Sequence, residues 1–363
     1  MNQLRFQTLR DYMKEHELNA ALITSPKNVF YLTGFLSRPY ERFLGLIVPV
    51  EGEPLLLLPK LDLEAAQQGS NIEHIVTHSD TQNPYEILKQ KLPLGIKKLG
   101  IENGELLVRR LEDLQKAIPE VEYADIGVPL QEMRTIKTED EVNCLRKAVQ
   151  ISEHALTIAI NNFKIGMTEL DVVAELEYQL KKNGSIGLTF NPIVLSGEKT
   201  SLPHGVSGQR TIQAGELLMV DLTALYGGYY SDITRTFAVG EINEGLKDMY
   251  QTVLNANIAA ITSVKPGVTM ASLDHAARNV ITENGYGEYF VHRVGHGIGI
   301  DNHELPSIHG KSQEYLKTGM TFTIEPGIYL PGIGGVRIED DILVTENGPE
   351  VLSPFPKELT IIG

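Results

Sequence analysis

The segments GELLMVD, residues 215–221, and GMTFTIE, residues 319–325, follow one plan. Each begins at a glycine, crosses an apolar stretch and ends on an acidic residue. Each is followed by a second acid on a strand-like segment, Asp232 in YYSDITRTF and Glu339 in GVRIEDDILV. Because a carboxylate at the end of an apolar strand is costly to bury alone, four of them in matched pairs predict a shared positive charge. A metal ion is the obvious candidate.

These segments belong to a longer internal repeat. KIGMTELD (164–171) is similar to KPGVTMASLD (265–274), and Thr168 and Thr269 are 101 residues apart. Each threonine is a predicted N-cap of the following helix, and each helix is predicted to end at an Asn-Gly pair. We infer two related halves, each a helical part followed by an antiparallel hairpin. Packing about a pseudo-twofold axis would bring the four acids together.

The repeat occupies the second of two predicted domains. Residues 1–125 alternate helical and strand patterns, which is typical of an α/β domain with a mixed or parallel sheet. Residues 126–137 are interpreted as a linker. A capping box at Thr138 opens a long helix that is predicted to continue to about Phe163. The sequence therefore predicts an α+β chain with a second domain at 138–363.

Composition excludes several classes of function. The net charge of −15 disfavours binding to nucleic acids and to anionic membranes. The single cysteine, Cys144, excludes an intrachain disulfide and a multi-cysteine zinc site, and is interpreted as a helix-face core residue. The charged N-terminus lacks the apolar core of a signal peptide, and no apolar run approaches the ~20 residues of a spanning helix. We expect a soluble, cytoplasmic protein without nucleic-acid or membrane partners.

Histidines between the two hairpins extend the predicted metal site. The segment VHRVGHGIGIDNHELP (291–306) holds His292, His296 and His303 among glycines that allow close backbone approach. Four carboxylates and one imidazole suit two divalent ions, and such oxygen-rich sets favour Mn²⁺, Co²⁺ or Fe²⁺ over structural zinc. Two ions about 3.5–4 Å apart can hold a bridging hydroxide and polarise a carbonyl. The alternative, solvated acids and satisfied core histidines, does not account for the symmetric pattern.

Strand alternation predicts supporting groups beside the acids. Residues i and i+2 of a strand share a face, which places Thr234 beside Asp232 and Arg337 beside Glu339. Thr234 is predicted to donate a hydrogen bond that orients the Asp232 carboxylate.

The order Asp221, Asp232, His296, Glu325, Glu339 resembles that of the metal-dependent prolidase and aminopeptidase P family. The segments VDLTALYGGYYSDITRTF, HRVGHGIGIDNHE, FTIEPGIY and GGVRIEDDILV carry the resemblance, which extends less specifically over the N-terminal domain. It implies a creatinase/prolidase-like α/β domain followed by a catalytic pita-bread domain with a pseudo-twofold repeat. It further implies that Asp221 chelates one metal, that His296 and Glu325 hold the other, and that Asp232 and Glu339 bridge them.

The resemblance also implies roles for residues around the metals. His204, in LPHG, would lie near the scissile bond, although a plain loop histidine is the alternative. His292 and His303 would line the proline pocket, with His303 stabilising the oxyanion. Tyr329 would lie beside the metals. Arg337 would lie near the proline side of the site, with a structural salt bridge as its alternative.

The implied reaction is hydrolysis of the peptide bond before proline, whose nitrogen has no hydrogen and whose ring fixes the backbone. A bridging hydroxide would attack the carbonyl, and Glu325 would carry a proton to the leaving nitrogen. The implied cofactors are two divalent ions, Mn²⁺ first, with Co, Fe or Zn also compatible. The implied partners are small peptides with proline at the second position and a second copy of the chain. No G-x-S-x-G elbow supports a serine nucleophile.

Several alternatives remain open at this stage. An Xaa-Pro dipeptidase is slightly favoured over an aminopeptidase P acting on longer peptides. A dipeptide's free carboxylate requires a cation, yet several prolidases place an arginine where this chain has Ser307, four residues after His303. Arg337 or a residue from elsewhere would then supply the charge. A non-catalytic binder of this fold would lose metal ligands that this chain keeps, and a nucleotide-binding first domain lacks a glycine loop.

Overall fold

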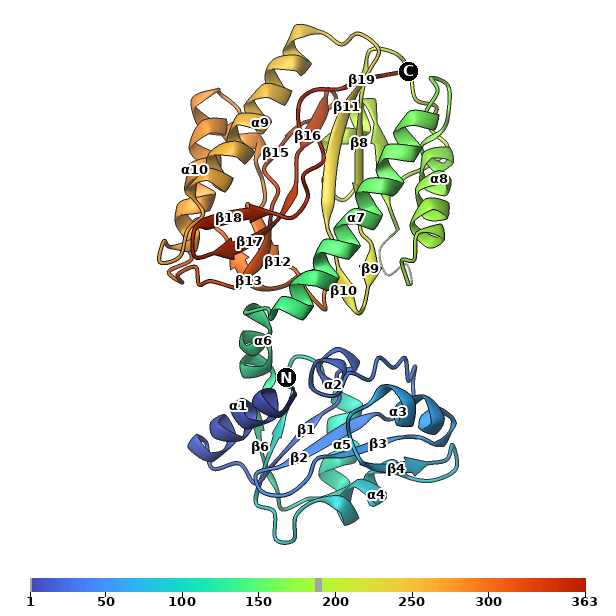
Figure 1. Cartoon of the computed structure of the whole chain (residues 1–363), viewed down its shortest axis with the longest axis vertical. Coiled ribbons are helices and arrows are strands. Elements are labelled where there is room, and N and C mark those ends of the chain that lie inside the picture. Colours follow the sequence, from blue (N-terminus) through green and yellow to red (C-terminus); the bar gives the residue numbers. More distant parts are fainter. Residues whose placement is uncertain (1, 187–190) are drawn as a thin grey trace. The chain divides into compact units, whose positions relative to one another are not determined.

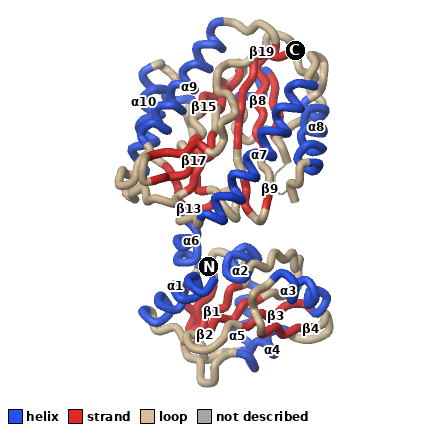
Figure 2. Tube along the Cα trace, in the orientation of Figure 1, coloured by secondary structure: helices blue, strands red, loops and turns tan. Residues whose placement is uncertain are grey.

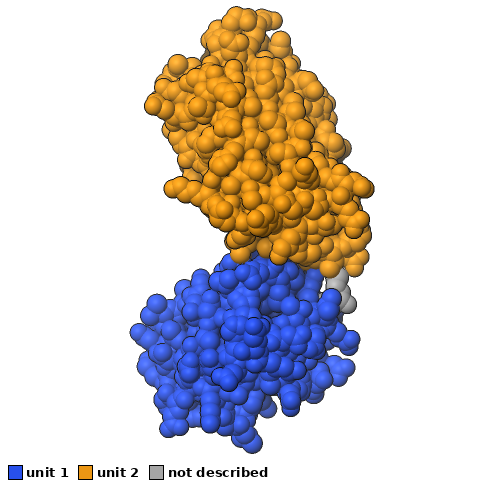
Figure 3. All heavy atoms as spheres, turned by 90° about the vertical axis from the view of Figure 1, so that its left-hand side faces the viewer, with its two compact units in different colours: residues 1–134 blue, residues 135–363 orange. Residues whose placement is uncertain are grey.

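The chain divides into two compact units, Met1–Arg134 and Thr135–Gly363, which are coloured separately in Figure 3. The structure is a computed structural model that describes residues 2–186 and 191–363. Most of the stretch interpreted as a linker forms a helix, α6 (Gly127–Thr135). Its Pro129 lies in the first turn, where the missing backbone N–H removes no helical hydrogen bond.

Unit 1 is an α/β layer structure around a mixed six-stranded sheet in the order β4-β3-β2-β1-β5-β6. The strands are β1 (Ala20–Ile23), β2 (Gly45–Pro49), β3 (Leu55–Pro59), β4 (His74–His78), β5 (Lys98–Ile101) and β6 (Glu122–Asp125). The helices are α1 (Asn2–Glu15), α2 (Pro26–Thr33), α3 (Leu63–Gly69), α4 (Pro84–Lys91) and α5 (Val108–Ala117), with the 3₁₀ turn η1 (Lys60–Asp62). The α/β prediction is confirmed, whereas α2 and β6 were not predicted.

The first half of unit 2 begins with the predicted capping box, in which the side chains of Thr138 and Glu141 each bond the other residue's backbone N–H. Its helices are α7 (Glu139–Asn162) and α8 (Glu169–Lys182). They cover a sheet in the order β19-β11-β8-β7. The strands of this half are β7 (Ile193–Ser196), β8 (Glu216–Leu222), β9 (Leu225–Tyr226), β10 (Tyr229–Tyr230), β11 (Ile233–Val239) and β19 (Ile361–Ile362), with the turn η2 (Gly197–Ser201).

The second half repeats this arrangement with α9 (Glu244–Ser263) and α10 (Met270–Glu283). Its sheet has the order β13-β12-β14-β17-β18. The strands are β12 (Gly295–Gly297), β13 (Glu304–Ile308), β14 (Thr321–Ile324), β15 (Gly327–Leu330), β16 (Gly334–Arg337), β17 (Asp340–Thr345) and β18 (Gly348–Val351), with the turn η3 (Gly287–Tyr289). In Figures 1 and 2, α7 and α8 flank the strands on one side and α9 and α10 on the other.

Matching backbone hydrogen bonds establish the predicted repeat. Gly215 N–H donates to Val239 O at 2.7 Å, and Gly319 N–H donates to Val344 O at 2.9 Å. Both glycines have a left-handed backbone, with φ of +86° and +88°, which a side chain would disfavour. The same plan therefore opens β8 and β14, as the two glycine-to-acid segments predicted.

The two helix caps of the repeat differ in chemistry. Thr168 is in a full capping box with Asp171, as a predicted N-cap should be. Thr269 occupies the predicted N-cap position of α10, but its side chain makes no capping hydrogen bond. A serine, Ser272, replaces the acid three residues on, and its hydroxyl bonds Thr269 O instead.

Each half of unit 2 encloses its own apolar core between helices and strands. In the first half, Ala155, Leu176 and Val220 are fully buried. In the second half, Met249 and Phe322 are fully buried. These cores hold the strands that carry the acids in a fixed register.

Among the described residues, no helix is long and apolar enough to cross a membrane.

Candidate metal centre

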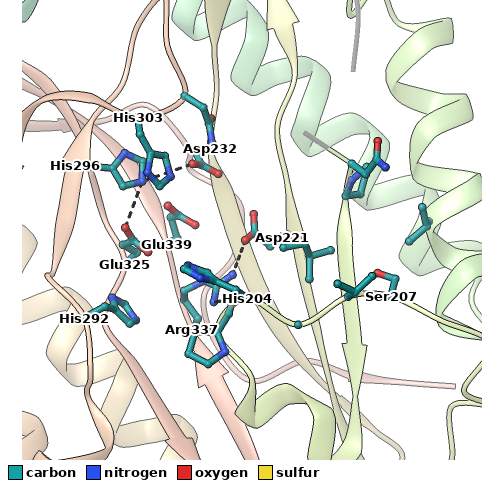
Figure 4. A pocket seen from close by; sticks show the side chains of 18 of the residues that line it. His204, Ser207, Asp221, Asp232, His292, His296, His303, Glu325, Arg337 and Glu339 are labelled. Atoms are coloured by element: carbon teal, nitrogen blue, oxygen red, sulfur yellow. Dashed lines mark hydrogen bonds and ion pairs between the residues drawn. The ribbon is translucent and has the colours of Figure 1, made fainter. Parts of the chain in front are cut away.

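The four acids predicted as metal ligands lie where the chain reverses direction in each half of unit 2. Asp221 is the next-to-last residue of β8, and Asp232 directly precedes β11. Glu325 directly follows β14, and Glu339 directly precedes β17. A two-stranded ribbon, β9–β10 or β15–β16, separates the members of each pair. The four carboxylates converge in one pocket, shown in Figure 4.

His296 completes this cluster from β12. Its Nε2 lies 3.3 Å from Glu325 Oε1 and 3.8 Å from Asp232 Oδ2. Its Nδ1 lies 3.1 Å from Gly297 O, a contact that favours a proton on Nδ1 and leaves the Nε2 lone pair facing the carboxylates. That tautomer is the one a metal ligand requires.

The glycines around His296 permit its position. A Cβ at Gly295 would lie 1.8 Å from Thr323 O, and a Cβ at Gly297 would lie 2.0 Å from Leu305 O. Because backbone atoms cannot yield by that much, only glycine fits on either side of the histidine. The predicted close backbone approach in this segment is confirmed.

The carboxylates are in an environment that opposes their negative charge. Burial, and then the neighbouring acids, raise the pKa values of Asp232 and Glu339 well above their usual range. Burial also raises the pKa of Glu325 to about 7. A shared cation would relieve both effects, since it replaces lost hydration and screens the mutual repulsion.

The donor atoms fit a divalent cation. Three groups have ligand atoms within 4.8 Å of one another: Asp221, Asp232 and Glu339; His296, Glu325 and Glu339; and Asp232, His296 and His303. Asp221 Oδ1 is buried and has no hydrogen-bond partner among the described residues. A buried, unpartnered carboxylate oxygen in such a cluster is a position for a metal ligand.

The side chain of Arg337 contacts several residues of the acidic cluster. Its guanidinium forms a buried ion pair with Asp221, and its Nε donates to Thr234 Oγ1 at 3.1 Å. Its Nη1 donates to the Tyr329 hydroxyl at 3.2 Å, which lies 2.9 Å from His292 Nε2. The salt bridge considered as an alternative for Arg337 is therefore present.

The predicted role of Thr234 is wrong. Its hydroxyl donates to Glu339 Oε2 at 2.6 Å and not to Asp232. Asp232 precedes the first residue of β11, so strand alternation does not extend to it. The two hairpins are also joined by a backbone hydrogen bond, in which Glu339 N–H donates to Thr234 O at 3.1 Å. This bond places the threonine next to the other half.

The remaining predicted histidines line a cavity of about 790 Å³ together with the acids. His303 stacks on His296, with ring centroids 3.7 Å apart and an interplanar angle of 27°. His204 is exposed and His292 half-buried, and burial lowers the pKa of His292 to about 4. In Figure 4, His292, His296 and His303 lie on one side of the cavity and Ser207 on the other, with His204 between them.

Two arginines near the site were not predicted from the sequence. Arg235, in DITRTF, is fully buried behind the acids, where it pairs with Asp340 at 2.8 Å and donates to Glu339 O at 2.5 Å. Arg293 lines the cavity directly after His292. Its place in HRVGHG, among the predicted histidines, was the available signal.

The fold and the site define a class of hydrolase, the pita-bread metallopeptidases preceded by a creatinase-type domain. The chain belongs to metallopeptidase family M24, whose sequence profile matches residues 143–346. The creatinase/prolidase N-terminal domain matches residues 5–136.

Similar proteins agree with this assignment. An uncharacterized peptidase of Staphylococcus aureus (strain bovine RF122 / ET3-1) is 40% identical over 347 residues, which cover 96% of this chain and 98% of the relative. An Xaa-Pro dipeptidase from Bacillus anthracis has 36% identity and a TM-score of 0.94, with 100% of both chains covered. An X-Pro aminopeptidase from Thermotoga maritima MSB8 has 32% identity and a TM-score of 0.88, covering 95% of this chain and 98% of the other.

Proposed function

We propose that this peptidase hydrolyses the bond before proline with two divalent metal ions, and that its preferred substrates are Xaa-Pro dipeptides. The observation that carries the proposal is the convergence of four buried acids and one histidine from both halves of unit 2. The names of the similar Xaa-Pro dipeptidase and X-Pro aminopeptidase support the substrate class.

In this proposal Asp221 would hold one ion, His296 and Glu325 would hold the other, and Asp232 and Glu339 would contribute to both. Bound ions would polarise the scissile carbonyl and activate water at neutral pH. Mn²⁺ is the proposed metal, because oxygen-rich ligand sets with one imidazole suit it, and Co²⁺, Fe²⁺ and Zn²⁺ are alternatives.

Glu325 is the proposed proton carrier. Its side chain is 15% exposed toward the cavity, so its carboxylate can exchange a proton with water there. The proline nitrogen must receive a proton before it can leave as an amine. Glu325 would take that proton from water and deliver it to the nitrogen.

The histidines and Tyr329 are proposed to hold the substrate. His303 reaches the cavity beside His296 and would donate a hydrogen bond to the developing oxyanion. His204 would lie near the scissile bond. His292 and Tyr329, bonded to each other and through Tyr329 to Arg337, would form a rigid wall against the proline ring.

A comparison of two substrates tests the proposal. The metal-loaded protein should cleave an Xaa-Pro dipeptide and should leave an Xaa-Ala dipeptide largely intact. It should also cleave Xaa-Pro-Xaa tripeptides more slowly than the dipeptide. Equal cleavage of dipeptide and tripeptide would make the second candidate, an Xaa-Pro aminopeptidase, the better description. Absence of any cleavage after Mn²⁺ or Co²⁺ addition would leave a non-catalytic peptide binder.

The assembly is part of the same proposal. The resemblance to prolidases supports a homodimer, and light scattering of the purified full-length chain distinguishes one copy from two.

A further inference from the structure

Two arginines line the cavity of the metal centre. They differ in whether an acidic side chain forms an ion pair with the guanidinium. Arg337 is buried and its guanidinium is committed to Asp221. Arg293 is half-buried, and its Nη1 donates to the neutral hydroxyl of Ser307 at 2.9 Å. Within residues 2–186 and 191–363, no acidic side chain forms an ion pair with Arg293. Among the described residues it therefore offers the cavity a positive charge that is not held in an ion pair, although it acts on Glu325 through space.

The guanidinium of Arg293 also has more N–H donors than its bond to Ser307 uses. A guanidinium carries five N–H donors in a planar fork, and the bond to Ser307 uses one of them. That bond fixes the side chain without cancelling its charge. The arrangement resembles a receptor for a planar anion more than a structural salt bridge, because guanidinium and carboxylate pair through two parallel bonds.

Arg293 lies among the residues that surround the proposed reaction. Arg293 and His303 line the same cavity. An anion bound by Arg293 would thus lie on the side of the cavity formed by the histidines.

A dipeptide has charges of opposite sign at its two ends. Its amine is compatible with the acids of the metal centre, whereas its carboxylate would be repelled by them. Since Arg337 is already paired, Arg293 is the arginine of the described cavity lining that remains available for the carboxylate. A longer peptide or a dipeptide amide has no negative charge at this position.

We propose that Arg293, held in place by Ser307, binds the C-terminal carboxylate of the substrate and thereby gives the peptidase its preference for dipeptides. This inference rests on the proposed function, and it names the residue that would decide between dipeptidase and aminopeptidase.

The test uses two substrates that differ only in this charge, Leu-Pro and Leu-Pro amide, with the metal-loaded full-length chain. Wild type should prefer the free acid. Arg293→Ser should lower kcat/KM for Leu-Pro by roughly 10- to 100-fold, as expected for loss of a charge-assisted hydrogen bond. It should change kcat/KM for the amide by less than about threefold, since the amide never uses the arginine. Lys311→Ser, which removes an exposed cation from the same unit, should change neither value.

A purely structural role for Arg293 predicts a different pattern, in which the variant loses both substrates in equal proportion. That outcome would overturn the inference, as would unchanged cleavage of Leu-Pro. Arg293→Lys provides a second variant if the serine variant folds poorly. It keeps the charge but lacks the planar fork, so an intermediate loss confined to Leu-Pro is expected.

The design also separates this inference from the proposed function. If wild type cleaves Leu-Pro and its amide equally well, Xaa-Pro hydrolysis stands and carboxylate recognition by Arg293 is refuted. If wild type with Mn²⁺ or Co²⁺ cleaves neither substrate, the proposed function fails and the inference fails with it.

Discussion

Arg337 of β16 and Asp221 of β8 form a buried ion pair between the two halves of unit 2, although 116 residues separate them in the chain. Arg337 is 4% and Asp221 8% exposed. Breaking such a pair leaves a buried carboxylate without its partner. We therefore expect Arg337→Met to destabilise the metal-free protein by about 3–5 kcal/mol.

Urea unfolding in the presence of a chelator measures this effect. Lys247→Met is the control, because Lys247 pairs with Glu244 at 2.8 Å in a solvent-exposed bridge and its loss should change the free energy of unfolding little. Mn²⁺ should recover more stability in Arg337→Met than in wild type, since the bound cation replaces the lost guanidinium charge. Equal destabilisation by the two substitutions would contradict this account.

Glu325→Gln should remove the proposed proton carrier while preserving the shape of the side chain. We expect kcat for an Xaa-Pro dipeptide to fall by roughly 10²- to 10⁴-fold, the usual contribution of a general acid–base group. Metal content should be measured on the same samples, so that a loss of chemistry is distinguished from a loss of ions. Activity within tenfold of wild type at full metal content would exclude Glu325 from this role.

The stability of the metal-free protein should fall between pH 6 and pH 8 because of Glu325. Its folded pKa of about 7 lies above the ordinary value, so its contribution is present at low pH and is lost as pH rises through 7. Relative to Glu325→Gln, wild type should lose on the order of 1 kcal/mol over this range. Unfolding at both pH values with a chelator tests the slope, and saturating Mn²⁺ should remove it. Parallel pH profiles for the two proteins would show that burial does not raise this pKa.

Asp221→Asn should change how many ions the protein holds. In the proposed centre Asp221 serves one ion, so the variant should retain about one divalent ion per chain where wild type retains two. Elemental analysis after equilibrium dialysis gives the count. Asp341→Asn is the control, because this neighbouring buried acid belongs to none of the three ligand groups. A wild-type count of one ion would refute the dinuclear proposal.

The two halves of the repeat allow the N-cap threonines of α8 and α10 to be compared. Thr168→Ala removes a capping box from α8 and should cost about 0.5–2 kcal/mol, measured by urea unfolding. Thr269→Ala, at the equivalent position of α10, removes no capping hydrogen bond and should cost less than ~0.5 kcal/mol. A larger loss at Thr269 than at Thr168 would contradict the difference between the two caps.

Local chemistry explains which parts of the fold could be predicted. Gly215 and Gly319 mark equivalent turns because their backbone conformation excludes most other residues. The capping box at Thr138 is likewise a short-range pattern, and it placed the start of α7 correctly. Helix α2 was missed although Ser25, Pro26 and Gly34 mark its two ends, whereas the four residues of strand β6 carry no comparable signal.

The site was predictable where residue type and spacing specify the chemistry. Asp221, Asp232, His296, Glu325 and Glu339 stand out as a ligand set because few other reasons place acids beside buried strands. The hydrogen bond of Thr234 was mispredicted, since alternation within one strand does not describe contacts between hairpins. Arg235 gave no distinctive pattern, and Arg293 was marked only by its place among the histidines of HRVGHG, because an arginine acquires its role from the groups that surround it in the fold.

The sequence by itself determined the repeat, the two types of domain and the acids and histidines available for a metal centre, because each is marked by short motifs of neighbouring residues. Only the tertiary structure decided the pairing of charges. Arg337 pairs with Asp221 from the opposite half, whereas Arg293 donates to the hydroxyl of Ser307 and forms no ion pair within the described part of the chain. Charge interactions depend on distance and burial in the folded chain, so the arginine left available for a ligand cannot be identified from spacing alone.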